Sequence, residues 1–152
     1  ITDQQAESLS RVEDLHLNGL TSISDQQAEN LSNRSSLELN SLNSISDQQA
    51  ENLSNIGWLE LNGLTSLTDE QTESLSKVEY LYLNGLTSIT DQQAVSLGKT
   101  GSLELRGLTS ITDEQAKSLR KIPLGLVISD ACYDVVSKYM KIGLTKASEN
   151  KY

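Results

Sequence analysis

The side chains best suited to chemistry in this 152-residue chain occupy a few recurring positions. The only tryptophan and two of the five tyrosines flank pairs of leucines, as do several glutamates and the only histidine. Aromatic side chains on a polar surface are enriched at the energetic centres of protein interfaces. We therefore predict a binding surface made of Trp58, Tyr80, Tyr82, Glu38, Glu60, Glu104, Arg106 and His16. The competing interpretation is that aromatic residues simply suit exposed strand positions.

The same residues offer little to an enzyme. Glu38 and Glu60 suggest a general acid–base pair, but such a pair needs an environment that drives the two pKa values apart. On an open strand surface both carboxyls would be solvated. Asp14 and His16 suggest part of a catalytic triad, but the sequence has no serine in a nucleophile motif. A zinc site would have to rely on the single histidine, which leaves too few of the usual ligands. We expect no catalytic residue, metal or cofactor, and we interpret Cys132 as a core residue.

A 22-residue repeat sets the positions of these side chains. Five units follow one another without insertion, at 1–22, 23–44, 45–66, 67–88 and 89–110. A sixth unit opens as ITDEQAKSL and departs from the pattern at 121–129. Such fixed-period self-similarity predicts a stack of equal units, none of which buries enough apolar surface to fold alone.

Each unit combines two periodicities. Leu15 and Leu17 alternate with polar residues, as in a short strand with one buried face. Thr2 followed by Gln5 is a capping box, so the other half of the unit is predicted to be a short helix with Asp3 in its first turn. An Asn-Gly pair after the strand predicts a turn. Residues that flank the leucines should point out of the sheet, so the predicted binding surface lies on one exposed face.

The recurring motif is Val-x-x-Leu-x-Leu-x-x-Leu followed by Ile-Ser-Asp, first at 12–25. It is similar to the LxxLxLxx(N/C)xxI(T/S)D pattern of leucine-rich repeat proteins, and residues 1–119 resemble the cysteine-containing subclass most closely. The resemblance implies an α/β solenoid with a parallel sheet on its concave face and helices on its convex face. It also implies a protein that binds other proteins or, in some members, glycans or lipids.

The sequence differs from that family's pattern at two points, and each difference leads to a further expectation. Leu20 and its copies stand where the family has a ladder of Asn or Cys, so the hydrogen bonds of that ladder must be made by other residues. Units of 22 residues are also short for the subclass, so the helices should have only two turns or so.

Residues 111–144 are interpreted as a degenerate repeat followed by a C-terminal cap. Ser129 is predicted to cap a helix over 130–140 that covers the end of the stack, and Gly143 to end it. The polar tail at 145–152 is expected to fray.

The N-terminal end shows no such cap, because the pattern is already under way at Ile1. We treat 1–152 as one domain. Two explanations stay open for its first unit: the chain is a piece of a longer protein, or the open edge associates with a second molecule.

The formal net charge of −9 disfavours nucleic acid, because an acidic surface is repelled by phosphate. No apolar run approaches the ~20 residues of a membrane helix, and the chain opens without a secretory signal pattern. A single cysteine rules out an internal disulfide, which fits the cytoplasm and a bacterial cell surface equally.

We expect a non-enzymatic scaffold that binds a protein or peptide, with a basic surface, on its concave face. A glycan-binding module is one alternative. Another is a spacer or stalk in a longer protein, favoured by the uniform column Asn18, Asn40, Asn62 and Asn84. Consensus engineering would also give a uniform skeleton, although the irregular second unit, Arg34-Ser35-Ser36, favours a natural chain.

Overall fold

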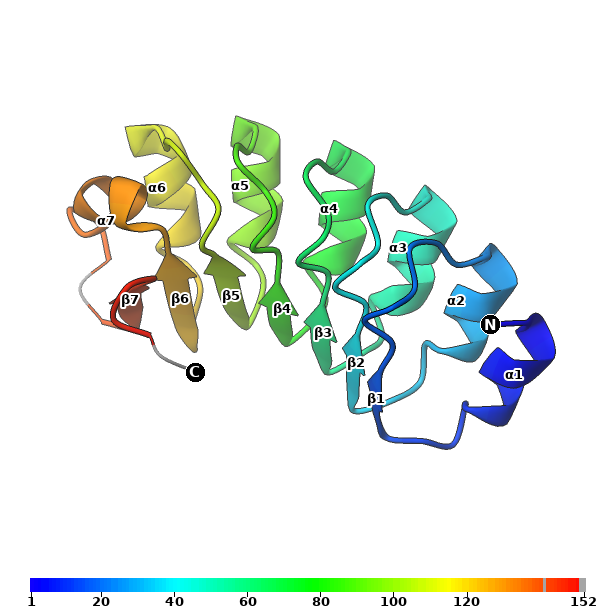
Figure 1. The fold of residues 1–152 in the computed structure, drawn as a ribbon. Helices are drawn as coiled ribbons and strands as arrows, with labels where there is room; N and C mark the ends of the chain where they lie inside the picture. Colours follow the sequence, from blue (N-terminus) through cyan, green and yellow to red (C-terminus); the bar gives the residue numbers. More distant parts are fainter. Residues whose placement is uncertain (141, 151–152) are drawn as a thin grey trace.

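The chain folds as a row of helix–strand units in the computed structural model, which describes residues 1–140 and 142–150 (Figure 1). In chain order the elements are α1 Asp3–Ser8, β1 Asp14–His16, α2 Asp25–Asn30, β2 Ser36–Glu38, α3 Asp47–Leu53, β3 Trp58–Glu60, α4 Asp69–Leu75, β4 Tyr80–Tyr82, α5 Asp91–Leu97, β5 Ser102–Leu105, α6 Asp113–Leu119, β6 Gly125–Ile128, α7 Asp130–Val136 and β7 Leu144–Lys146. In this part of the chain no helix has the length and apolar character needed to cross a bilayer.

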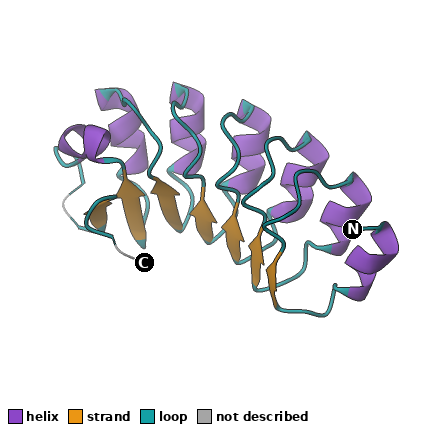
Figure 2. Cartoon of the chain, in the orientation of Figure 1, coloured by secondary structure: helices purple, strands orange, loops and turns teal. Residues whose placement is uncertain are grey.

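The described strands form one parallel sheet of seven strands in sequence order. From β1 to β5 the register advances by one repeat at each step, so Leu15 lies beside Leu37 and Leu37 beside Leu59. The strands line one side of the row and the helices the other, and the row bends with its strands on the inner side (Figure 2). The predicted α/β architecture of repeated units is confirmed, and the strand side is called the concave face below.

Each of the helices α1 to α6 begins at its predicted capping box. In α1 the Thr2 hydroxyl accepts from the Gln5 N–H at 3.2 Å, and Gln5 Oε1 accepts from the Thr2 N–H at 2.8 Å. The glutamine amide also joins neighbouring units, because Gln27 Nε2 donates to the Ile1 carbonyl at 3.0 Å and later copies repeat this bond. One side chain therefore starts a helix and fastens it to the preceding unit.

The core is a column of leucine between the sheet and the helices. The leucine within each of β2, β3 and β4 and the leucine directly after each strand are fully buried. Leu42 and its copies at 64, 86 and 108 are 0–2% exposed, so the leucine column that follows the strands belongs to the core. In the first unit Ile1 and Val12 are 41% and 39% exposed, because that unit has a neighbour on one side only.

The glycine that follows the strand lies close to the backbone of the preceding unit. A Cβ at Gly63 would clash with the carbonyl oxygens of Leu42 and Asn40. The φ angle is positive only at Gly143 in the described chain, so the predicted Asn-Gly turn needs no left-handed residue. Close approach between units, rather than turn conformation, selects glycine at this position.

The predicted C-terminal helix over 130–140 is too long, because α7 ends at Val136. Ser129 precedes it without a side-chain capping bond, and its buried hydroxyl has no hydrogen-bond partner in the described structure. Met140 is nevertheless only 6% exposed. The apolar spacing therefore indicated that Met140 is buried, but it did not indicate where the helix ends. The chain must leave the helix early in order to return to the sheet.

That return forms β7, which pairs with β6 after a turn at Gly143 with φ of 76°. Part of the tail expected to fray is therefore a strand. Its backbone finds partners in β6, and that gain outweighs its polar composition. Residues 151–152 of the expected fraying tail lie outside the described residues.

Candidate functional site

The concave face carries two rows of outward side chains that follow the strand register. The first row runs through Asp14, Ser36, Trp58, Tyr80 and Ser102, and the second through His16, Glu38, Glu60, Tyr82 and Glu104. Neighbouring strands are about 4.8 Å apart. The structure therefore brings seven of the predicted binding residues onto one face, and Arg106 follows directly after β5.

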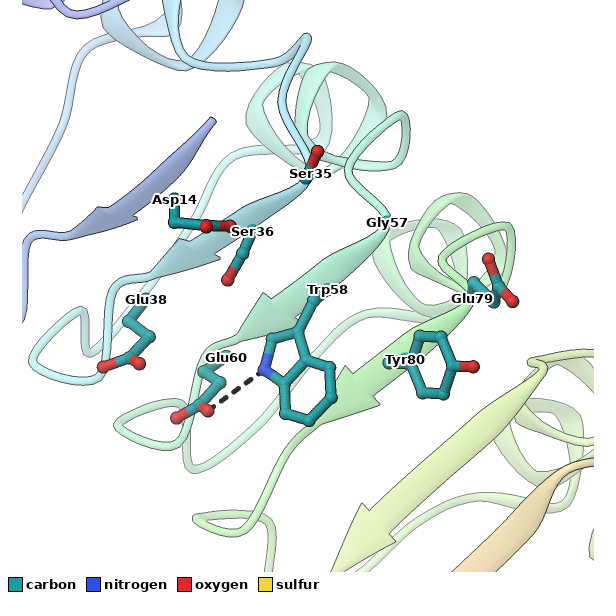
Figure 3. Close-up of a pocket in the computed structure, with 9 residues that line it drawn as sticks. All are labelled: Asp14, Ser35, Ser36, Glu38, Gly57, Trp58, Glu60, Glu79 and Tyr80. Atoms are coloured by element: carbon teal, nitrogen blue, oxygen red, sulfur yellow. Dashed lines mark hydrogen bonds between the residues drawn. The ribbon is translucent and has the colours of Figure 1, made fainter. Parts of the chain in front are cut away.

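The aromatic residues form a stack. The ring of Trp58 lies 5.5 Å from that of Tyr80 and 4.8 Å from that of Tyr82, with interplanar angles of 25° and 26°. Both tyrosines belong to β4, so the indole has aromatic neighbours on its β4 side, whereas its register neighbour on β2 is Ser36, which carries no ring. The indole N–H donates to Glu60 Oε1 at 3.2 Å (Figure 3). Trp58 keeps 37% of its surface exposed.

An asparagine ladder runs along the ends of the strands. The side-chain oxygen of Asn18 accepts from the Asn40 backbone N–H at 3.0 Å, and the same bond recurs from Asn62, Asn84 and Arg106 to the residue one unit earlier. The ladder was missed from the sequence, although the uniform asparagine column was its signal. It supplies, from a different position, the cross-unit bonds that the buried leucine column cannot make.

The same asparagines hold the glutamates of the second row. Asn18 Nδ2 donates to Glu38 at 2.6 Å, and Asn40 Nδ2 donates to Glu60 at 2.9 Å. His16 Nδ1 lies 2.6 Å from Glu38 Oε1. The hydrogen bond from His16 lowers the pKa of Glu38, and the Glu38 carboxylate raises the pKa of His16. Much of the hydrogen-bonding capacity of Glu38 and Glu60 is therefore used by neighbouring residues of the same chain.

A shallow hollow of about 590 Å³ opens over the first strands (Figure 3). Its lining is Asp14, Ser35, Ser36, Glu38, Gly57, Trp58, Glu60, Glu79 and Tyr80, and we call it the N-terminal hollow. Asp14 and Glu79 are exposed, and neither carboxylate has an ion pair or hydrogen bond within the described residues. No lysine or arginine lines this hollow, and of its four carboxylates only Glu38 has an ion-pair partner among the described residues, namely His16.

A second hollow of about 610 Å³, the C-terminal hollow, is lined by Trp58, Glu60, Asn62, Tyr82, Asn84, Glu104, Arg106 and Asn150. Arg106 Nε bonds Glu104 Oε2 at 2.8 Å, and its Nη1 donates to the carbonyls of Ala147 and Asn150, both at 3.1 Å. The Glu104 carboxylate raises the pKa of Arg106. Burial, followed by the charges of Glu104 and Glu60, raises the pKa of Tyr82 to about 12.

The predicted binding residues thus divide into two groups. Glu104 is only 7% exposed, and with Arg106 it holds the C-terminal segment against the sheet. Trp58 and Glu38 line the hollow that keeps free carboxylates. A binding role for all eight residues stays a prediction, and the geometry places its most accessible part at the N-terminal hollow.

Comparison of the chain with models of known protein families gives no match, and comparison with curated proteins finds no relative. The argument for function therefore rests on the concave face and its chemistry.

Within residues 1–140 and 142–150, no three His, Cys, Asp or Glu side chains approach closely enough to hold a metal ion. Cys132 is buried, as expected of a core residue, and its Sγ lies 3.7 Å from the Leu108 carbonyl oxygen.

Proposed function

We propose that this chain is a leucine-rich repeat solenoid that serves as a non-enzymatic binding scaffold, and that its concave face binds a positively charged segment of a protein or peptide. The observation that carries the proposal is the N-terminal hollow, where an exposed indole stands beside four carboxylates, of which only Glu38 has an ion-pair partner among the described residues. The repeat motif described above is the basis of the family assignment.

Charge and aromatic surface act together in this proposal. Four acidic residues line the hollow, namely Asp14, Glu38, Glu60 and Glu79. Their field would speed the approach of a basic segment and disfavour an acidic one. Trp58 would then supply the buried contact area that typically dominates binding energy.

The asparagine ladder weakens the main argument for a spacer. The spacer interpretation depended on the uniformity of the asparagine column, whereas recognition should require variation. The ladder needs asparagine for its cross-unit hydrogen bonds. The uniformity of that column therefore has a structural explanation and does not by itself favour a spacer. The rows that do vary, at Trp58 and Tyr82 for example, are the ones exposed to a partner.

The test is calorimetric titration with a blocked twelve-residue peptide of alternating Arg, Lys and Gly, a second peptide with Glu at the basic positions, and a neutral tetrasaccharide. We expect binding of the basic peptide alone. The double variant Trp58→Ala, Tyr82→Ala should weaken it by about thirtyfold, because truncating a hot-spot aromatic costs about 1 kcal/mol or more. Asp14→Asn with Glu79→Gln should weaken it several-fold.

The matched control is Glu7→Gln with Glu73→Gln, which removes the same charge from exposed positions on the helix side. This pair should change affinity less than about twofold, since distant exposed charges are screened by salt. Equal losses in the control and in the hollow variants would show that only net charge matters. Tight binding of the tetrasaccharide would overturn the proposal in favour of a glycan-binding module.

A further inference from the structure

The N-terminal hollow contains a narrow slot over β2. In the first row of the concave face, Ser36 stands between Asp14 on β1 and Trp58 on β3, in direct register with both. Strands about 4.8 Å apart place the backbones at Asp14 and Trp58 about 9.6 Å apart, with only a hydroxymethyl group between them. Figure 3 shows Asp14, Ser36 and Trp58 on three neighbouring strands, and the hollow that they line leaves room over Ser36 for a flat group at van der Waals distance, about 3.5–4.0 Å, from the side chains around it.

The aromatic rings that line the hollow, Trp58 and Tyr80, lie on its β3 and β4 sides, and no ring lines it on the β1 and β2 sides. Tyr80 and Tyr82 already occupy the side of the indole that is turned toward β4. Quaternary ammonium ions are recognised by cages in which several aromatic faces surround the cation. Rings on one side only favour a planar cation that stacks on the aromatic surface instead.

The opposite wall and the floor supply acceptors. The Asp14 carboxylate has no bonding partner in the described structure. Glu38 accepts from His16 and Asn18, yet an ionised carboxylate offers about four lone-pair sites and so retains capacity. A ligand in the slot would therefore meet an aromatic surface on one side and hydrogen-bond acceptors at its edges.

Resting on the proposed function, we infer that the N-terminal hollow selects an arginine side chain of its partner, with the guanidinium stacked on the indole of Trp58 and its N–H groups donated to Asp14 and Glu38. The guanidinium is planar, weakly hydrated and carries its donors in a fixed fork. A lysine ammonium is compact and strongly hydrated, so it gains less from the indole. The arginine belongs to a peptide segment, because the carboxylate of the free amino acid would face Glu60 and Glu79.

The experiment uses the emission of Trp58, the only tryptophan, and because Trp58 lines both hollows the variant Asp14→Asn assigns the signal to the N-terminal hollow. The full chain is titrated with the blocked tripeptide acetyl-Gly-Arg-Gly-amide, its lysine counterpart, free arginine and tetramethylammonium. We expect the arginine tripeptide to bind at least about threefold more tightly than the other three, from stacking at a partly exposed site. Asp14→Asn should weaken binding of the arginine tripeptide about fivefold and reduce the preference for arginine over lysine.

Glu73→Gln is the matched control, and its affinity for the arginine tripeptide should be unchanged. Chemical shifts of the Trp58 indole N–H provide a second readout if emission changes little. Equal binding of arginine and lysine tripeptides overturns the inference while the proposed function stands. Equal or tighter binding of tetramethylammonium or free arginine also overturns it. If neither the tripeptides nor the longer basic peptide binds, both the inference and the proposed function fail.

Discussion

The two hollows on the concave face share Trp58 and Glu60 but differ in how their carboxylates are balanced. In the N-terminal hollow Asp14 and Glu79 face solvent, and no basic residue lines the surface apart from the neighbouring His16. In the C-terminal hollow Arg106 neutralises Glu104 and bonds the carbonyls of the C-terminal segment.

A single change in the repeat produces this difference. Arg106 occupies the position that holds asparagine in the four preceding units. Its backbone N–H still completes the asparagine ladder, while its side chain reaches the C-terminal segment. One substitution therefore converts a row suited to recognition into an anchor for the end of the chain, and leaves the other half of the face open.

The largest effect should come from removing that anchor. Arg106→Ala leaves the nearly buried Glu104 without its cation, and we expect a loss of about 2–3 kcal/mol in the free energy of unfolding. Urea denaturation measures the loss, and amide exchange should accelerate in β7. The comparison variant Asp14→Asn, in the other hollow, should change stability by less than about 0.5 kcal/mol. Similar losses in both variants would abolish the distinction between the hollows.

Breaking the ladder should affect both hollows alike. Asn62 accepts from the Asn84 N–H at 3.0 Å and donates to Glu60 at 3.3 Å. Asn62→Ala should lower the free energy of unfolding by about 1–2 kcal/mol, because a backbone donor loses its partner. Asn55→Ala, at an exposed position with only a 3.5 Å contact to Asn52, is the control. Equal stability of the two variants would mean that water replaces the ladder at no cost.

Arg34 offers a smaller effect of opposite sign. It is the only cation in the unit beneath the N-terminal hollow, yet it is 7% exposed and bonds the Leu31 and Val12 carbonyls at 2.6 and 3.0 Å. Its Nη2 has no partner in the described structure, and burial lowers its pKa.

Equivalent positions hold buried Ile56 and Val78. Arg34→Ile should therefore raise the free energy of unfolding by about 1 kcal/mol, because a buried charge is replaced by a packed side chain. Thermal denaturation at fixed pH measures the change. The variant should leave binding of basic peptides intact, since Arg34 does not line the hollow. A net destabilisation would show that its two carbonyl bonds outweigh its desolvation.

The smallest effect concerns His16, which faces Glu38, Glu60 and Asp14. Its hydrogen bond to Glu38 raises its pKa above 6.5. The resulting stabilisation is complete below the unfolded pKa and is lost as pH rises through the higher folded value. An NMR titration of this single histidine should give a pKa above 6.5 that falls in Glu38→Gln. A native value at or below 6.5 would contradict the ion pair.

Much of the framework follows from local sequence. The Thr2 and Gln5 pattern identifies helix starts because a capping box satisfies donors within one turn. Alternation at Leu15 and Leu17 assigns strand faces, and fixed spacing aligns Trp58 with Tyr80. The ladder and the glutamine bond to the preceding unit were missed, because both act between units and nothing within one unit requires them.

The repeat, the capping boxes of α1 to α6, the leucine core and the set of side chains on the concave face could all be predicted from the sequence, because they depend on contacts within a unit or on strict periodicity. Which partner each charged side chain has could not be predicted, because it depends on contacts between segments that are distant in the sequence. Glu38 and Glu104 occupy equivalent positions, yet one meets His16 and the other meets Arg106 and the returning chain. The physical reason is that β7 folds back beside β6, where no local pattern predicted a strand, and so closes one half of the face while the other stays open.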